Sequence, residues 1–231
     1  MRILLVAATH FEIEGILIAL SSDVDPNSVY DPEYLITGPG IFNTAYGLGR
    51  HLVGKNYDLI INVGIAGALD KSIEIGSAVN ITSDYFSDFG AEAGAQFLSA
   101  FDIGLIDNNE FPFKNGWIVN DNFPNLASLA MLREAKGITV NTVHGNTTSI
   151  SKLKERITAD VESMEGAAFL HICLANQLPC LQIRTVSNYV EKRNRKNWKI
   201  PMALDNLSAV VVNLLKEMQN INSDSKQSVP K

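Results

Sequence analysis

The sequence contains very little cysteine: Cys173 and Cys180 are the only two in 231 residues, and they do not form a Cys-x-x-Cys pair. This argues against a disulfide framework and against a structural zinc site of the usual ligand spacing. Both cysteines lie among apolar residues, so we expect them to be small members of the core. The four histidines show no metal-ligand spacing either, and the sequence predicts no bound metal.

The chain also lacks a long hydrophobic run. No apolar segment approaches the ~20 residues of a membrane-spanning helix. The apolar start, residues 3–8, is followed directly by polar and acidic residues, whereas a signal peptide has a longer leader and a cleavage site. We therefore predict a cytoplasmic protein without a membrane partner, in which residues 3–8 form a buried strand.

Positive charge is scarce. Lysine and arginine number 19 against 25 aspartates and glutamates, which gives a net charge of −6. A chain of this sign is poorly suited to neutralising a phosphate backbone, so we expect no nucleic-acid partner. The same balance is compatible with a ligand of nucleoside size, and the 46% hydrophobic fraction is that of an ordinary globular protein.

What the chain does have is an alternation of short apolar segments with amphipathic ones. Strands separated by helices predict a largely parallel sheet with helices on its faces. The predicted strands are residues 3–8, 59–63, 78–82, 137–143 and 181–186, and the predicted helices are residues 10–20, 43–53, 163–176 and 200–218.

The organisation along the chain is simple. Residues 86–125 are irregular and rich in aromatic side chains, which indicates a long excursion from the sheet. No repeat and no clear linker occur, so we predict a single domain at residues 1–218. Residues 219–231 are polar and lack periodicity, which predicts a disordered tail.

Ligands of open α/β sheets bind beyond the carboxyl ends of the strands. The candidate ligand-binding segments are therefore residues 9–14, 64–68, 143–148 and 187–195, together with the start of the helix at Ser163. The Gly38-Pro39-Gly40 segment is set apart, because it lacks the third glycine and the later acidic residue of a dinucleotide-binding fingerprint. We interpret it as a tight turn packed against the sheet.

Four segments stand out when those loops are considered together. They are Ala-Thr-His-Phe-Glu at residues 8–12, Asn-Val-Gly-Ile-Ala-Gly at 62–67, Val-Glu-Ser-Met-Glu-Gly-Ala-Ala at 161–168 and Arg-Thr-Val-Ser-Asn at 184–188. In this order they resemble segments of the purine nucleoside phosphorylase and nucleosidase superfamily. The resemblance covers nearly the whole chain and implies a three-layer α/β/α sandwich with a mixed, largely parallel central sheet.

One further stretch narrows the resemblance. Residues 187–198 read Ser-Asn-x-Val-x-x-Arg-x-x-x-x-Trp, which is similar to a segment of the futalosine hydrolase subfamily, whereas methylthioadenosine and adenosylhomocysteine nucleosidases have Ser-Asp at its start. The resemblance implies an N-glycosidase that uses water to split the small-molecule nucleoside futalosine into hypoxanthine and dehypoxanthine futalosine, in an alternative pathway to menaquinone. It implies no cofactor and no metal, and a homodimer or larger homo-oligomer.

The resemblance assigns Ser163, Met164 and Glu165 to the sugar. The Glu165 carboxylate would accept hydrogen bonds from the ribose 2′- and 3′-hydroxyls, and its charge would favour a cationic sugar. Met164 would pack on the ring. A second interpretation stays open, because the helix dipole alone favours an acidic residue just after an N-cap such as Ser163, and Met164 is then a core residue.

Glu12 is expected to hold and deprotonate the attacking water. Glu14 competes for this role, but its spacing from the strand end fits less well, and an exposed carboxylate on a first helical turn is the plainer alternative for Glu12. Residues 9–14 contain no lysine or arginine, so a phosphate nucleophile would find no cation there. Ala66 and Gly67 are expected beside the sugar, because small residues permit close backbone approach.

Asn188 is expected to face the purine near N7 and the 6-position. Its amide can donate to O6 of hypoxanthine, although it could also rotate and accept from the amino group of adenine. The alternative is an asparagine that caps a turn. Arg193, or Arg195, is a candidate for the carboxylate on the 5′ side of futalosine, and the alternative is a solvated surface charge. His144 could approach the loop that faces the base.

Rival functions remain at this point. The nearest is a nucleosidase for methylthioadenosine, adenosylhomocysteine or 6-amino-6-deoxyfutalosine, which would release adenine from all three. A purine nucleoside phosphorylase would form a sugar phosphate, where a hydrolase forms a free sugar. A noncatalytic nucleoside-binding protein would bind its ligand and release no base at all.

Overall fold

In the computed structural model of the chain, residues 1–22 and 32–227 are described. They form a nine-stranded sheet and a separate two-stranded hairpin, β5 (Gly90–Ala93) with β6 (Gln96–Ser99). The large sheet comprises β1 (Ile3–Ala7), β2 (Glu33–Ile36), β3 (Leu59–Ala68), β4 (Ala78–Phe86), β7 (Phe113–Lys114), β8 (Trp117–Val119), β9 (Arg133–Thr139), β10 (Val161–Ser163) and β11 (Cys180–Tyr189). The helices are α1 (His10–Ser22), α2 (Ile41–Leu52), α3 (Ala127–Ala130), α4 (Thr147–Arg156), α5 (Gly166–Ala175), α6 (Ile200–Gln227) and the 3-10 helix η1 (Arg195–Asn197).

The sheet is mixed and largely parallel, as predicted. β1 runs parallel to β2 and β3, β11 to β3, and β9 to β4 and β10, while β10 with β3 and β11 with β4 are antiparallel. β3, β11, β4, β9 and β10 pair in a closed circuit, so the centre of the sheet is a ring. The ring forms because β3 and β4 have 10 and 9 residues, which is long enough to hold different partners along their lengths.

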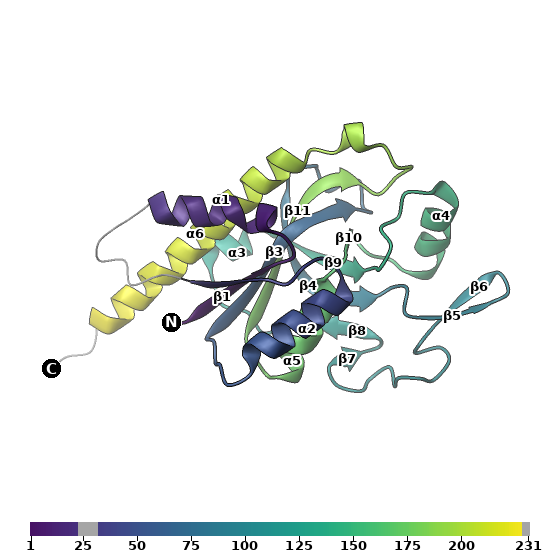
Figure 1. The fold of residues 1–231 in the computed structure, drawn as a ribbon, viewed down its shortest axis with the longest axis horizontal. Coiled ribbons are helices and arrows are strands. Elements are labelled where there is room, and N and C mark those ends of the chain that lie inside the picture. The colour runs from purple at the N-terminus through teal and green to yellow at the C-terminus, as the bar shows by residue number, and fades with distance from the viewer. Residues whose placement is uncertain (23–31, 228–231) are drawn as a thin grey trace.

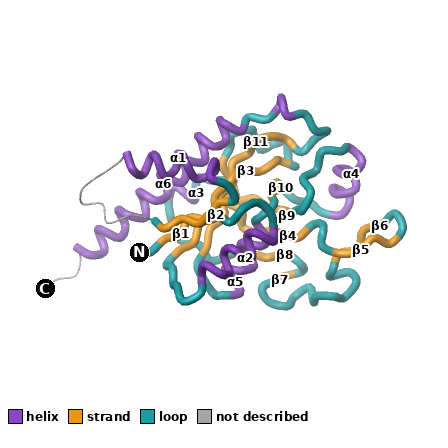
Figure 2. The backbone as a smooth tube through the Cα atoms, viewed as in Figure 1, coloured by secondary structure: helices purple, strands orange, loops and turns teal. Residues whose placement is uncertain are grey.

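Two helical layers cover the sheet, as Figures 1 and 2 show for α1 with α6 on one side and α2 with α5 on the other. Strand β1 explains why both faces need cover, since all five of its residues are buried. Leu5 packs with Ile13 of α1 and Leu207 of α6. Leu4, on the opposite face, packs with Leu48 of α2. A continuous apolar run therefore predicted a doubly covered strand correctly.

Both cysteines lie in the α2–α5 layer of the core. Cys173 on α5 and Cys180 at the start of β11 are buried and free, and they belong to the same apolar cluster. The prediction of small core residues is confirmed.

Several element boundaries differ from the prediction. β3 continues through Gly64 to Ala68, where a loop was expected, because it pairs with β11 along that whole stretch. Ser163 ends the short strand β10, and α5 begins only at Gly166. The strand expected at residues 137–143 is β9, which runs from Arg133 to Thr139. The sequence did not predict β2, α3, α4 and η1, which are short or have few apolar residues.

The excursion at residues 86–125 contains more regular structure than expected. It forms the β5–β6 hairpin, which extends from the body of the molecule (Figure 1), and the short antiparallel pair β7–β8 at the edge of the large sheet. Phe113 of β7 packs edge-on against Phe101, with ring centroids 5.1 Å apart. Both side chains belong to the same apolar cluster as Leu48 of α2 and Phe169 of α5, so this segment extends the core of the α2–α5 layer.

Helix α6 runs to Gln227, past Met218, where the sequence predicted its end. No proline or glycine interrupts the helix at residues 219–227, and the disorder predicted for residues 219–231 stays a prediction. Residues 228–231 of the predicted tail lie outside the described residues. Within residues 1–22 and 32–227, no helix has the length and apolar character that crossing a bilayer requires.

Candidate active site

A cavity of about 460 Å³ opens at the carboxyl ends of β1, β10 and β11 and beside the second half of β3. Seven of the eight predicted site residues line it: Glu12, Ala66, Gly67, Ser163, Met164, Glu165 and Asn188. The other lining residues are Ala8, Thr9, Phe11, Pro39, Ile65, Val143, His144, Glu162, Ser187, Trp198, Ile200 and Leu204. Side chains more than 170 positions apart in the sequence therefore meet around one hollow.

Arg193 is the exception among the predicted residues. It is exposed and does not line the cavity. Its guanidinium lies over the ring of Trp198, 5.0 Å from the centroid, and Trp198 in turn lines the cavity. Arg195 lies 5.8 Å from the same ring. A cation–π contact thus holds the Arg193 side chain behind the tryptophan, and its contact with the 5′ carboxylate of a ligand stays a prediction.

Glu12 is positioned by the start of helix α1. Thr9-His-Phe-Glu12 forms half of a capping box, in which Glu12 Oε2 accepts hydrogen bonds from the Thr9 backbone N at 3.0 Å and from Thr9 Oγ1 at 2.8 Å. The other oxygen, Oε1, accepts from the Ile65 backbone N at 3.1 Å. Helix capping accounts for Oε2 alone. The contact with β3 turns the carboxylate toward the cavity and favours a role beyond capping.

Gly64 makes room for this carboxylate. A Cβ at position 64 would lie 2.7 Å from Glu12 Oε1 and 3.1 Å from Arg184 Nη1. Burial raises the pKa of Glu12, and the nearby Arg184 guanidinium acts in the opposite direction. Arg184 itself is fully buried and donates to Asn62 Oδ1. The site therefore holds a carboxylate of raised basicity that a buried cation keeps within reach of ionisation.

Glu165 is held by the opposite side of the cavity. It is the N-cap residue of α5, in place of the Ser163 expected there, and its side chain makes no capping bond. Its Oε1 accepts a hydrogen bond from the Gly40 backbone N at 2.9 Å, at the start of α2. The Gly38-Pro39-Gly40 turn, interpreted from the sequence as a packing element, thus supports the carboxylate with the positive end of a helix. Gly38 and Gly40 have φ values of 89° and 93°, which glycine adopts readily.

A buried network fixes the segment that carries Glu165. Asp84 Oδ1 accepts from Thr139 Oγ1 at 2.8 Å, and Thr139 Oγ1 accepts from the Ala167 backbone N of α5 at 2.7 Å. Asp84 Oδ2 accepts from Gln182 Nε2 at 3.0 Å. A Cβ at Gly166 would lie 2.1 Å from Asp84 Oδ2, so a glycine is required where α5 crosses this network.

The Asp84 network predicts a pH-dependent stability. Burial raises the pKa of Asp84 to about 6 from its ordinary 3.8. Because the folded pKa is the higher one, its contribution is complete below the unfolded pKa and is lost as pH rises through about 6. By linkage, two pKa units correspond to roughly 3 kcal/mol of unfolding free energy.

The Asp84→Asn variant should lack this pH term. Its amide can donate to Gln182 Oε1, which has no partner in the structure, once the glutamine amide rotates. Urea unfolding at pH 4.5 and 7.5 should show the variant gaining stability relative to the unchanged chain as pH rises. A pH-independent difference between the two proteins contradicts the assignment.

Asn188 is placed by an irregularity at the end of β11. The pairing of β11 with β3 shifts between Val186 and Asn188, so that Asn188 pairs with Gly67. Ser187 Oγ donates to Asn188 Oδ1 at 2.8 Å, and Asn188 Nδ2 donates to the Tyr189 carbonyl at 2.9 Å. The bulge aims the side chain into the cavity. With Oδ1 already engaged by Ser187, the second Nδ2 hydrogen is the group that Asn188 offers to a ligand.

The sequence indicated His144 but not its buried partner in the same wall, Glu162. Glu162 of β10 is buried and pairs with the ring of His144, and both residues line the cavity. Glu162 directly precedes the predicted Ser163–Glu165 group, which is the signal that could have found it. The apolar wall formed by Phe11, Trp198 and Leu204 was also missed, since apolar side chains carry no chemical signature.

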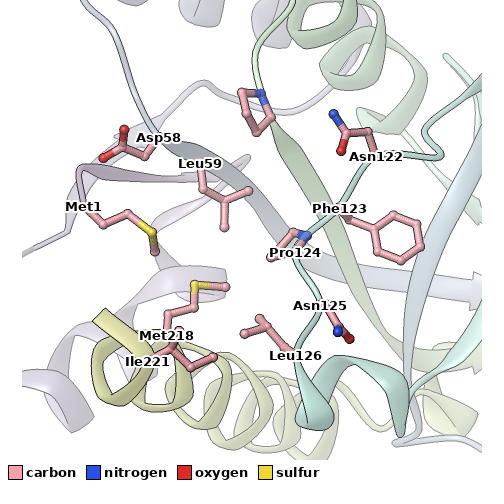
Figure 3. Close-up of a pocket in the computed structure, with 11 residues that line it drawn as sticks. Met1, Asp58, Leu59, Asn122, Phe123, Pro124, Asn125, Leu126, Met218 and Ile221 are labelled. Atoms are coloured by element: carbon pink, nitrogen blue, oxygen red, sulfur yellow. The ribbon is translucent and has the colours of Figure 1, made fainter. Parts of the chain in front are cut away.

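A second cavity, of about 400 Å³, lies where β1, β3 and β11 begin (Figure 3). Its walls are mainly apolar side chains such as Leu59, Phe123 and Leu126. The one carboxylate there, Asp58, accepts a hydrogen bond from the Arg2 backbone N at 2.6 Å. It offers no pair of carboxylates for chemistry. In the part of the chain that the structure describes, no group of three or more His, Cys, Asp or Glu side chains could hold a metal ion.

Fold and cavity together define the class of this protein: an α/β protein with a cavity that is lined by three glutamate carboxylates near the carboxyl ends of its strands. A family model described as the phosphorylase superfamily matches residues 36–216. The chain belongs to this superfamily.

Two relatives of the chain illustrate two differently named enzymes with similar sequences. The chain is 30% identical to futalosine hydrolase of Thermus thermophilus over 80% of its own length and 81% of the relative's. It is 26% identical to the 5′-methylthioadenosine/S-adenosylhomocysteine nucleosidase of Haemophilus ducreyi over 78% of each chain.

Solved structures share the fold. The nucleosidase of that name from Helicobacter pylori, crystallised with butyl-thio-DADMe-Immucillin-A, superposes with a TM-score of 0.75 at 18% identity, over 94% of this chain and 98% of that one. A futalosine hydrolase mutant of Helicobacter pylori superposes with a TM-score of 0.72 at 16% identity, over 94% and 99%. The fold predicted from the sequence is confirmed.

Proposed function

We propose that this chain is a nucleosidase that hydrolyses futalosine to hypoxanthine and dehypoxanthine futalosine, in the alternative pathway to menaquinone. The observation that carries the proposal is the convergence of Glu12, Glu165 and Asn188 on one cavity. The sequence similarity between this chain and the Thermus thermophilus futalosine hydrolase supports the choice of substrate. Breaking a sugar–purine bond makes the sugar cationic and leaves electrons on the base, and the three side chains suit the three resulting tasks.

Glu165 accepts hydrogen bonds from the ribose hydroxyls and stabilises the positive charge that develops on the sugar. Glu12 holds a water molecule through its ionised carboxylate and takes a proton from it during the attack on C1′. Ala66 and Gly67 let the ligand approach the β3 backbone closely. Ser163 and Met164 complete the sugar side.

Water, and not phosphate, is the nucleophile of this proposal. The cavity lining contains the carboxylates of Glu12, Glu162 and Glu165 and no lysine or arginine. A phosphate dianion would meet repulsion from these groups without a cation to offset it. The buried Arg184 is committed to Asn62 and does not line the cavity.

The base preference follows from Asn188. Its free Nδ2 hydrogen can donate to O6 or N7 of hypoxanthine, whereas adenine presents a donor at the 6-position. Apolar side chains, Phe11, Trp198 and Leu204, form a wall suited to the aromatic 5′ substituent of futalosine. Arg193 and Arg195 would then act on its carboxylate only from behind Trp198 or after moving.

We also propose that the chain acts in the cytoplasm as a single domain within a homodimer or larger homo-oligomer. The exposed surface of α2 supports the assembly. Phe42 and Tyr46 are 78% and 61% exposed and stack with ring centroids 6.4 Å apart. Adjacent exposed aromatic side chains of this kind are typical of protein interfaces.

The direct test is base release without phosphate. Incubation of the purified chain with futalosine in phosphate-free buffer should release hypoxanthine at the full rate, measured by chromatography. Adenine release from methylthioadenosine and adenosylhomocysteine should be much slower. A strict requirement for phosphate would refute the hydrolase, faster adenine release would point to the nucleosidase alternative, and binding without release would indicate a noncatalytic protein.

A further inference from the structure

The cavity holds one pair of titratable side chains that the proposed reaction has not used. Glu162 is buried, with a side chain 3% exposed, and His144 is 15% exposed. The Glu162 carboxylate accepts a hydrogen bond from the His144 backbone N at 2.9 Å and a second from ring Nδ1 of the same residue. Because Glu162 occupies Nδ1, Nε2 is the ring nitrogen that remains for a ligand.

The strand pairing places this pair beside the base-facing side of the site. Glu162 pairs with Gly67 in the β10–β3 ladder, and Asn188 pairs with the same Gly67 in the β11–β3 ladder. Glu162 and Asn188 therefore lie at one level, on either side of β3. His144, which contacts Glu162, stands at this level too.

The proposed reaction needs a proton at that position. When the C1′–N9 bond breaks, its electron pair moves to the purine, and the purine is a poor leaving group unless a ring nitrogen is protonated. An amide cannot supply the proton, so Asn188 can only donate a hydrogen bond. Glu12 and Glu165 act in their ionised forms. Among the residues lining the cavity, His144 is the remaining side chain whose type exchanges a proton near neutral pH.

We propose that His144 is the proton donor to the leaving purine and that Glu162 is the positioning residue that holds its ring. This inference rests on the proposed nucleosidase reaction. In the step, the C1′–N9 bond breaks, the His144 Nε2 proton passes to a purine ring nitrogen, water forms the new C1′–O bond, and the proton released by water passes to Glu12. Once Glu12 has released its proton to solvent and His144 has taken one up, the sum is nucleoside plus water giving free base and free sugar.

The surroundings of His144 allow the proton to be replaced. The residue also lines a third cavity, of about 480 Å³, on the outer side of the same wall. That cavity is bordered by the β5–β6 hairpin and by exposed α4 side chains, Lys152, Glu155 and Arg156. His144 thus separates the reaction cavity from a charged surface hollow, from which solvent protons can return to the ring after base release.

The test compares two leaving groups in the same protein preparation. Futalosine needs its base protonated, whereas futalosine methylated at N7 carries a positive base that leaves without a proton. The His144→Gln variant should hydrolyse futalosine about 100-fold more slowly than the unchanged chain, and the N7-methylated substrate less than threefold more slowly. Glu162→Gln should show the same selective loss at about 10-fold. His51→Gln, a histidine on α2 outside the cavity, is the matched control and should leave both rates unchanged.

The ratio of the two rates is independent of how much of a variant is folded, so a structural defect cannot mimic the expected pattern. Equal losses on both substrates would overturn the role of His144 while leaving the nucleosidase intact. Failure of the unchanged chain to release a base from either substrate would overturn the proposed function, and this inference with it.

Discussion

Replacing Glu12 by glutamine is expected to lower the turnover of futalosine by about 1,000-fold without unfolding the protein, a loss of about 4 kcal/mol of transition-state stabilisation. Glutamine keeps the shape of the side chain but cannot take a proton from water. The hydrogen-bond donors around the Glu12 carboxylate also require an acceptor at both oxygen positions. The Thr9 backbone N and hydroxyl face Oε2, and the Ile65 backbone N faces Oε1. An amide nitrogen at either place meets a donor, so the variant loses both the base and its orientation.

Glu14 provides the control for this experiment. It lies two residues further along α1, is exposed, and does not line the cavity. Glu14→Gln should stay within about twofold of the unchanged rate, because exposed charges of this kind contribute little. Thermal unfolding of both variants checks that the fold is retained. Residual turnover of Glu12→Gln near that of Glu14→Gln would remove the water-activating role.

The environment of Glu12 also predicts how the turnover of futalosine depends on pH. The base works in its ionised form, and burial raises the pKa of Glu12. Turnover should therefore fall as pH drops through this raised pKa, at a higher pH than an ordinary glutamate would give. The residual turnover of the Glu12→Gln variant should not show the fall at low pH that protonation of Glu12 causes.

The sequence predicted the site better than it predicted the elements that hold it. Glu12, Glu165 and Asn188 each follow or end a strand, and the carboxyl ends of neighbouring strands meet at one edge, so the sequence alone was enough to predict that they converge. It was not enough to predict what supports these side chains. Gly40 contacts Glu165 across 125 positions of sequence, and no local pattern encodes such a distance.

Local sequence patterns also gave wrong element boundaries where a segment pairs with a distant strand. Gly64–Ala68 looks like a glycine-rich loop, yet it continues β3, because β11 supplies hydrogen bonds along its whole length. Ser163 looks like an N-cap, yet it ends β10, because the pairing with β9 extends to Thr139. In each case a tertiary partner overrode the local preference.

The second large effect concerns the base. The Asn188→Asp variant is expected to change the ratio of adenine release to hypoxanthine release by about 1,000-fold in favour of adenine, because a site that hydrogen-bonds one partner discriminates strongly against the opposite pattern. A carboxylate at position 188 accepts only, so it would repel O6 of hypoxanthine and accept from the 6-amino group of adenine. The hydroxyl of Ser187, which now donates to Asn188 Oδ1, would still donate to the carboxylate.

The measurement is a competition between two substrates that share the same sugar and differ only in the base. Futalosine and 6-amino-6-deoxyfutalosine are mixed at equal concentration, and both bases are separated by chromatography. Asn194→Asp is the matched control, since Asn194 lies on the loop that follows β11, is exposed and bonds only within its own turn; it should leave the ratio unchanged. The carboxylate at position 188 also meets the Tyr189 carbonyl that Nδ2 now contacts at 2.9 Å, so the variant should lose some stability. An unchanged ratio in a folded variant would mean that another group reads the 6-position, and His144, at the same level of the sheet, would be the first to replace.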